Sequence, residues 1–169
     1  MRSILFFCSL HVSITLLAHT EHHHGKHSNT AQAEEPAADL KKVYADINKE
    51  YFLSVKPVFD KKCAACHSVD VAAPWYTSIP IVHWIVESDR SEAKEHLEIS
   101  KGFPFAGHGT PEEDLKAIRE VASKGTMPTW LYSFMHPGSK LTEEDKAKVL
   151  NWVDTSEKKV TAVVTSPKQ

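Results

Sequence analysis

Apolar residues recur at helical spacing along most of the chain, and the alternation typical of strands is rare. The first such stretch, residues 39–55, carries six apolar or aromatic residues at that spacing: Leu40, Val43, Tyr44, Ile47, Tyr51 and Phe52. Pro57 then begins a new helix that runs into the sequence CAACH. We find no internal repeat. The pattern therefore predicts an all-α domain.

A long helical stretch follows over residues 79–100, after a proline-containing loop at 68–80. In this helix we expect Ile81, Trp84, Ile85 and Leu97 to point inward.

The last two predicted helices carry their own boundary signals. Thr110 and Glu113 form a capping-box pattern before one of them, and Gly125 follows its end. Thr142 and Asp145 form a similar pattern before the C-terminal helix. We expect that helix to bury four residues: Val149, Leu150, Trp152 and Val153.

The two ends of the chain differ from its middle. Residues 1–18 resemble a secretory signal peptide, with cleavage after Ala18 or as late as Ala33; an uncleaved membrane anchor is the alternative. Residues 19–38 are polar and rich in histidine, which indicates a disordered linker, although a metal-binding segment is an alternative. We expect a domain over 39–155, a flexible tail over 156–169, and no integral membrane domain once the signal peptide is removed.

Composition adds two constraints. The chain has 169 residues, of which 41% are hydrophobic and 25% charged, with a net charge of −2, so we expect one domain and no nucleic-acid binding. Removal of the signal peptide leaves two cysteines, Cys63 and Cys66. The mature protein is expected in an oxidising compartment, the periplasm, where free thiols rarely persist.

The two cysteines and His67 form the sequence Cys-x-x-Cys-His, the attachment signature of c-type haem. Two thiols at this spacing can bond the two vinyl groups of one porphyrin edge, and the following histidine can bind the iron. Two other roles for the cysteine pair fit less well. A thioredoxin-like dithiol needs a βαβ context, whereas the surrounding sequence predicts helices. A structural zinc site usually needs four ligands, and the mature chain has no further cysteine. A disulfide within this short loop would constrain little.

The second iron ligand is predicted to be Met127, which precedes Pro128 ahead of the C-terminal helix. Its alternative role is to fill a gap in the core. Met135 and His136 are other candidates for the ligand. Three further histidines are more typical of surface or supporting positions: His83, His96 and His108.

These motifs occur in an order that resembles class I cytochrome c. The sequence is more closely similar to a small bacterial haem-binding domain family with a single CxxCH motif. That resemblance covers about residues 50–155 and rests on "VKPVFDKKCAACHS", "PWY", "PIVHWIV" running to "HLEIS", and "MPTWLYSFMHP". It implies one haem c bound covalently at Cys63 and Cys66, with His67 and Met127 as axial ligands. Thr129 departs from the pattern, which usually has a second proline there.

The expected function is that of a mono-haem electron carrier, not an enzyme, with redox proteins as transient partners. Lys61 and Lys62, or the acidic residues 143–145, could bias the choice of partner. The alternatives are a peroxidase-like haem enzyme and a gas sensor. Both need an open iron site, and in the enzyme His136 or His108 would act as the acid–base group. Metal delivery through the histidine-rich segment is a further alternative.

Overall fold

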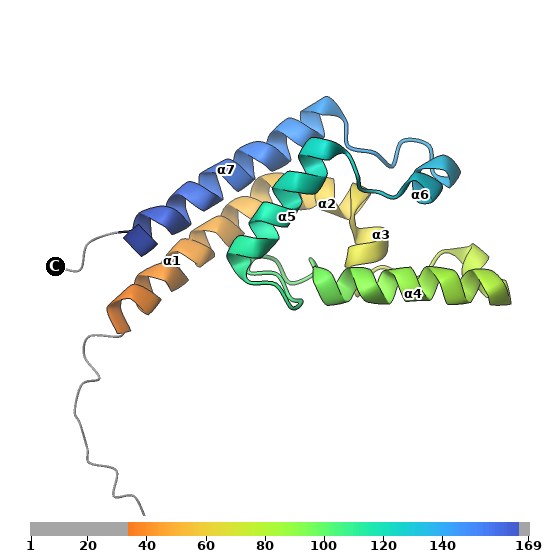
Figure 1. Cartoon of the computed structure of the whole chain (residues 1–169), viewed down its shortest axis with the longest axis horizontal. Helices are drawn as coiled ribbons and strands as arrows, with labels where there is room; N and C mark the ends of the chain where they lie inside the picture. Colours follow the sequence, from red (N-terminus) through yellow and green to blue (C-terminus); the bar gives the residue numbers. More distant parts are fainter. Residues whose placement is uncertain (1–33, 166–169) are drawn as a thin grey trace, which may run out of the picture. The chain divides into compact units, whose positions relative to one another are not determined.

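The computed structural model describes residues 34–165 (Figure 1). In this part of the chain the regular structure is helical, and the only β pairing is an isolated antiparallel bridge between Glu98 and Ala106. The elements are α1 (Glu34–Glu50), the π-helix η1 (Tyr51–Val55), α2 (Lys56–Lys62), α3 (Ala64–His67), the 3₁₀ helix η2 (Trp75–Ser78), α4 (Pro80–His96), α5 (Pro111–Lys124), α6 (Trp130–Met135) and α7 (Glu143–Thr165). The predicted all-α class is confirmed.

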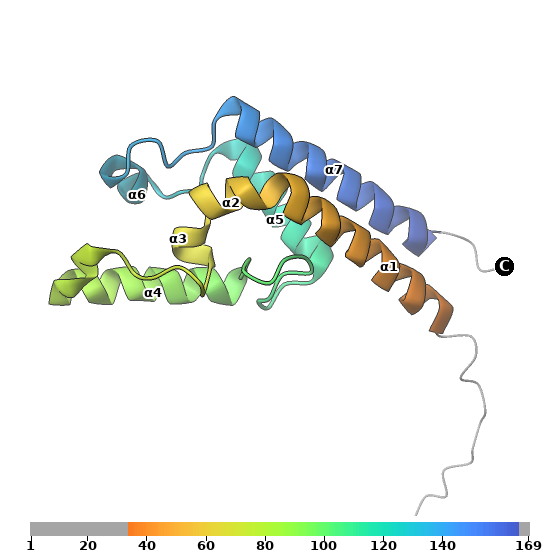
Figure 2. The same cartoon turned by 180° about the vertical axis from the view of Figure 1, so that it is seen from behind.

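The core lies where α1 and α5 pack against α7. Helices α1 and α7 run side by side in both views (Figures 1 and 2). Tyr51 is fully buried at its centre, and its ring contacts those of Phe59, Phe105 and Trp152. Its hydroxyl donates a hydrogen bond to the carbonyl oxygen of Ile99 at 3.2 Å. The core thus joins the first helices to the segment that follows α4.

The predicted boundary signals are confirmed. The Thr110 side chain accepts a hydrogen bond from the Glu113 backbone, and the Glu113 carboxylate accepts one from the Thr110 backbone. Gly125 ends α5 with a φ of +64°, a conformation that favours glycine. Thr142 and Asp145 form the same reciprocal pair ahead of α7.

The prediction for the inner face of α4 is wrong for three of its four residues, whereas the fourth, Leu97, is partly buried against the core. Ile81, Trp84 and Ile85 are exposed, at 77%, 78% and 55%, whereas the charged Arg90 is only 5% exposed. Helix α4 packs against α3 and η2, so only one narrow side of it is covered. Its hydrophobic stripe does not coincide with that side, and His83 is exposed as well.

Helix α7 is longer than we predicted. We expected a flexible tail from residue 156, yet the helix continues to Thr165, with Ser156 and Val160 buried. These two residues extend the buried stripe of Val149 and Val153 along α7, which packs against α1 and α5. Helix α1 likewise begins at Glu34, inside the segment that we predicted to be a linker.

Within residues 34–165, none of the helices combines the length and the hydropathy that a membrane crossing requires. The predicted signal peptide and most of the histidine-rich segment lie outside the described residues.

Candidate functional site

The CAACH sequence forms a single helical turn. Pro57 starts α2, which ends at Lys62, and α3 follows from Ala64 to His67. The backbone amides of Cys66 and His67 both donate to the Cys63 carbonyl oxygen, at 3.1 and 3.0 Å. Residues three and four positions apart share one face of a helix, so this turn brings both thiols and the imidazole together.

Both thiols are free, and both cysteines are partly buried. Burial raises the pKa of Cys63 to about 12. Burial also raises the pKa of Cys66, and the nearby Arg90 only partly offsets this effect. Reactive dithiols have lowered pKa values, so this pair does not have the electrostatics of a thioredoxin-like site.

The imidazole of His67 is oriented by the backbone. Its Nδ1 lies 2.8 Å from the carbonyl oxygen of Leu97. A carbonyl oxygen can only accept, so Nδ1 carries the proton and Nε2 keeps its lone pair. A backbone acceptor of this kind typically orients a histidine that binds a metal through its other nitrogen.

Residues 97–100, which we call the strap, run beside the segment that follows His67. The Ile99 amide donates to the His67 carbonyl oxygen at 2.9 Å, and the Ser68 and Ser100 hydroxyls are 2.8 Å apart. The buried Glu98 carboxylate accepts from the amide of Ser100. Burial alone would raise the pKa of Glu98, but hydrogen bonds from Ser100 and from the Val69 amide lower it overall. The strap thereby stabilises the position of His67.

Met127 lies on the loop between α5 and α6, and 47% of it is exposed. It therefore does not fill a gap in the core, which was the alternative role. Met135, at the end of α6, is exposed to a similar extent. Both thioethers are accessible to a bound group.

Both ring nitrogens of His136 are engaged. Nδ1 lies 3.0 Å from the Tyr132 carbonyl oxygen, and Nε2 lies 3.3 Å from the Tyr76 hydroxyl. Because the carbonyl must accept from Nδ1, the lone pair of Nε2 accepts from Tyr76. The ring also stacks on Tyr132 at 4.1 Å. His136 thus joins α6 to η2.

This junction lies close to the attachment turn. The pKa values of Tyr76 and Tyr132 are raised, first by burial and next by the neighbouring Cys66. Six large apolar side chains on η2, the start of α4 and α6 are nevertheless mainly exposed: Trp75, Ile81, Trp84, Ile85, Trp130 and Phe134. So much exposed apolar surface usually marks a binding site.

The residues present fit a haem. The attachment turn supplies two thiols and an oriented imidazole, and the neighbouring elements supply apolar side chains that a porphyrin can cover.

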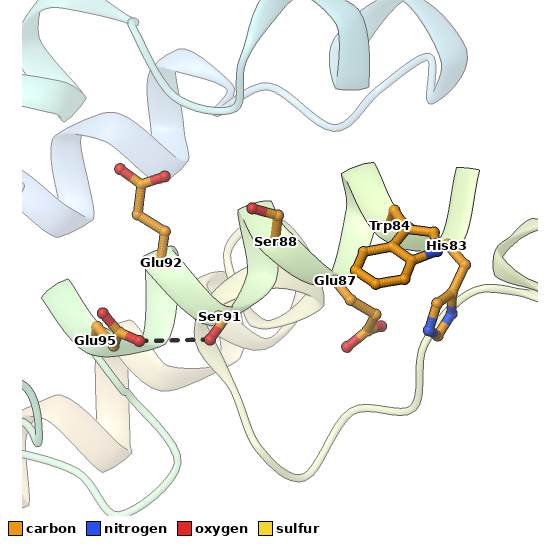
Figure 3. Close-up of a pocket in the computed structure, with 7 residues that line it drawn as sticks. All are labelled: His83, Trp84, Glu87, Ser88, Ser91, Glu92 and Glu95. Carbon is orange, nitrogen blue, oxygen red and sulfur yellow. Dashed lines mark hydrogen bonds between the residues drawn. The ribbon is translucent and has the colours of Figure 1, made fainter. Parts of the chain in front are cut away.

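A cavity of about 610 Å³ lies along α4 (Figure 3). Its seven lining residues all belong to this helix, and three are acidic: Glu87, Glu92 and Glu95. Ser91 donates to Glu95 at 3.5 Å, as the dashed line shows. None of the four predicted site residues lines this cavity, which is an acidic surface feature distinct from the attachment turn.

Two parts of the site were not predicted from the sequence. Arg90 binds the attachment turn from α4, and the strap orients His67. Arg90 stands among charged residues and gives no sequence signal. The segment "HLEIS" resembles a family motif, but its sequence does not indicate that it orients the histidine.

The comparisons with known proteins agree with this type of site. The chain matches the haem-binding domain family over residues 14–155 and belongs to that family. It is also 27% identical, over 96 residues, to the cytochrome c peroxidase Ccp of Escherichia coli (strain K12). That match covers 56% of this chain and 21% of the relative, so the chain spans about a fifth of the relative's length. No solved structure matches. The predicted family is confirmed, and the protein is a haem-binding domain.

Proposed function

We propose that the protein is a periplasmic mono-haem c-type cytochrome that carries electrons between redox proteins. The observation that carries this proposal is the 2.8 Å hydrogen bond from His67 Nδ1 to Leu97, made within a Cys-x-x-Cys-His turn. It leaves Nε2 as the ligand atom for iron. Thioether bonds to Cys63 and Cys66 would hold the single haem c.

The bound haem supplies reversible one-electron chemistry at its iron. The chain's own residues hold and shield it. His67 would bind the iron through Nε2, the strap would keep its ring in place, and the apolar side chains of η2, α4 and α6 would pack against the porphyrin and exclude water. Outer-sphere transfer needs no general base. His136, one candidate for that role, already uses both nitrogens.

Met127 is the proposed second ligand. Its thioether is accessible, whereas the lone pair of His136 Nε2 is engaged by Tyr76. Thioether ligation favours ferrous iron and raises the reduction potential, as suits a carrier.

The second candidate is a peroxidase-like haem module. It is favoured by the partial similarity to a cytochrome c peroxidase. This function requires an iron position that peroxide can reach, so Met127 would have to be displaced or absent from the iron.

Transient redox partners fit the charged surface. Lys61 is exposed, and Lys62 donates to the Gly138 carbonyl oxygen at 2.6 Å, so Lys61 is the freer of the two cations. The acidic residues of the α4 cavity offer a second charged surface. Contacts of this kind speed encounter more than they add affinity.

The test is the visible spectrum of protein produced with the c-type maturation machinery. We expect a haem that survives denaturation, a far-red band from Met–iron ligation when oxidised, and no carbon monoxide binding when reduced. Met127→Ala should lose the band and bind carbon monoxide, while the matched control Met135→Ala should keep it.

Three outcomes would contradict the proposal. Absence of covalent haem would overturn the attachment site. Loss of the band in Met135→Ala alone would move the ligand to Met135. A wild-type haem that is high-spin and binds carbon monoxide would favour the peroxidase-like module.

A further inference from the structure

Arg90 is a buried cation in contact with the attachment turn. It is 5% exposed, on the side of α4 that packs against α3. Its Nη1 donates to the Ala65 carbonyl oxygen at 2.6 Å, and its Nη2 donates to the Val71 carbonyl oxygen at 2.7 Å. One guanidinium therefore bridges two points of the chain that are six residues apart.

These two carbonyls enclose the functional part of the turn. Ala65 lies between the two cysteines, and Val71 lies four residues beyond His67. The planar guanidinium can donate along two directions at once, which a lysine ammonium on a flexible stem does poorly. Arg90 thus holds the segment that carries Cys66 and His67.

The charge of Arg90 is only partly compensated. Its Nε is buried without a hydrogen-bond partner, and the Glu87 carboxylate lies 3.6 Å away, too far for a hydrogen bond. The Glu87 Oε1 atom that faces Arg90 is itself buried without a hydrogen-bond partner, although 38% of the Glu87 side chain as a whole is exposed.

We propose that Arg90 is a positioning residue that raises the reduction potential of the haem, through its clamp on the attachment turn and the buried charge it places there. The inference rests on the proposed covalent haem. Ferric haem carries one more positive charge than ferrous haem, so a fixed cation nearby disfavours the oxidised state. The negative charge of Glu87 favours the oxidised state and so lowers the reduction potential.

The experiment measures the reduction potential and the melting temperature of the haem-loaded protein. Arg90→Met should lower both while the far-red band is retained. Arg90→Lys should keep most of the potential but lower the melting temperature, because one ammonium cannot hold both carbonyls. Glu87→Gln should raise the potential.

Arg119→Met is the matched control. Arg119 pairs with Asp154 and Glu157, and it joins α5 to α7 away from the attachment turn. Its loss should lower the melting temperature and leave the potential unchanged.

The proposal is overturned if Arg90→Met leaves the potential unchanged, or if Arg119→Met lowers it by as much. If Arg90→Met yields no folded protein, Glu87→Gln decides: a higher potential supports the proposal, and an unchanged or lower one overturns it. A wild-type protein without covalent haem would instead refute the proposed function, which the spectrum shows before any variant is made.

Discussion

Two buried carboxyl groups, Glu98 and Asp114, have pKa values shifted in opposite directions. Glu98 accepts backbone hydrogen bonds, which lower its pKa despite burial. Asp114 is 5% exposed in the first turn of α5. Burial, followed by the charge of Glu113, raises its pKa from 3.8 to about 6, against an opposing effect of His108. Similar burial thus has different consequences, depending on the hydrogen-bond donors at hand.

Asp114→Asn should stabilise the protein at neutral pH. Because folding raises the pKa of Asp114, the protonated carboxyl stabilises the folded protein below about pH 3.8, and this contribution is lost as the pH rises through 6. The shift corresponds to at most about 3 kcal/mol, and we expect a gain of about 1–2 kcal/mol, because asparagine forgoes the favourable interaction of a charge with the helix N-terminus. Urea unfolding of the wild type and the variant at pH 4 and pH 7.5 measures this gain in the free energy of unfolding.

The gain should be present at pH 7.5 and nearly absent at pH 4. The exposed Glu120→Gln serves as the control, since its ion pair with Lys124 should contribute little. An equal effect of Asp114→Asn at both pH values would refute the raised pKa.

Residue chemistry also explains which parts of the site were predictable. The CAACH motif is readable because its three functional groups lie within five residues, and their spacing is set by one helical turn. Leu97 and Arg90 meet that turn from 30 and 25 residues away. Such contacts depend on the path of the chain, which no local pattern encodes.

At the scale of elements, helix boundaries marked by capping residues were predicted better than helix faces. The caps at Thr110 and Thr142 are local bonds between a side chain and the backbone three residues on, so the sequence contains both partners. The end of α7 depends instead on burial against α1, and the inner face of α4 depends on α3 and η2. Tertiary packing of this kind overrides local preference.

The extension of α7 should contribute to stability. Val160→Ala removes two buried methyl groups and leaves a small cavity, which should cost about 2 kcal/mol. Val164→Ala, four residues on in the same helix, is the matched control, because Val164 is 68% exposed and should change little. Chemical denaturation of both variants measures the difference. Equal effects would mean that the last turns of α7 do not pack as described.

At the scale of the whole molecule, the six large apolar side chains exposed on η2, α4 and α6 form an apolar part of the surface. The Tyr76–His136 hydrogen bond joins η2 to α6. A bound porphyrin would remove part of this surface from water, and binding of any ligand to the folded state alone stabilises that state.

Protein without haem should therefore bind a hydrophobic dye several-fold more strongly than haem-loaded protein, and should melt at a lower temperature. Two haem-free forms make the comparison: the double variant Cys63→Ser/Cys66→Ser, and wild-type chain produced without the maturation machinery. The second form keeps its thiols, so it separates loss of haem from loss of sulfur. Equal dye fluorescence with and without haem would show that these side chains do not contact the cofactor.

The group that orients His67 is a main-chain oxygen. No substitution at position 97 deletes it, so this orientation tolerates point mutation at the residue that provides it. An insertion or deletion between Arg90 and Leu97 would be different, because it would move the carbonyl relative to the arginine that clamps the same turn. The orientation of His67 thus depends on the length of the segment between Arg90 and Leu97 more than on which side chain stands at position 97.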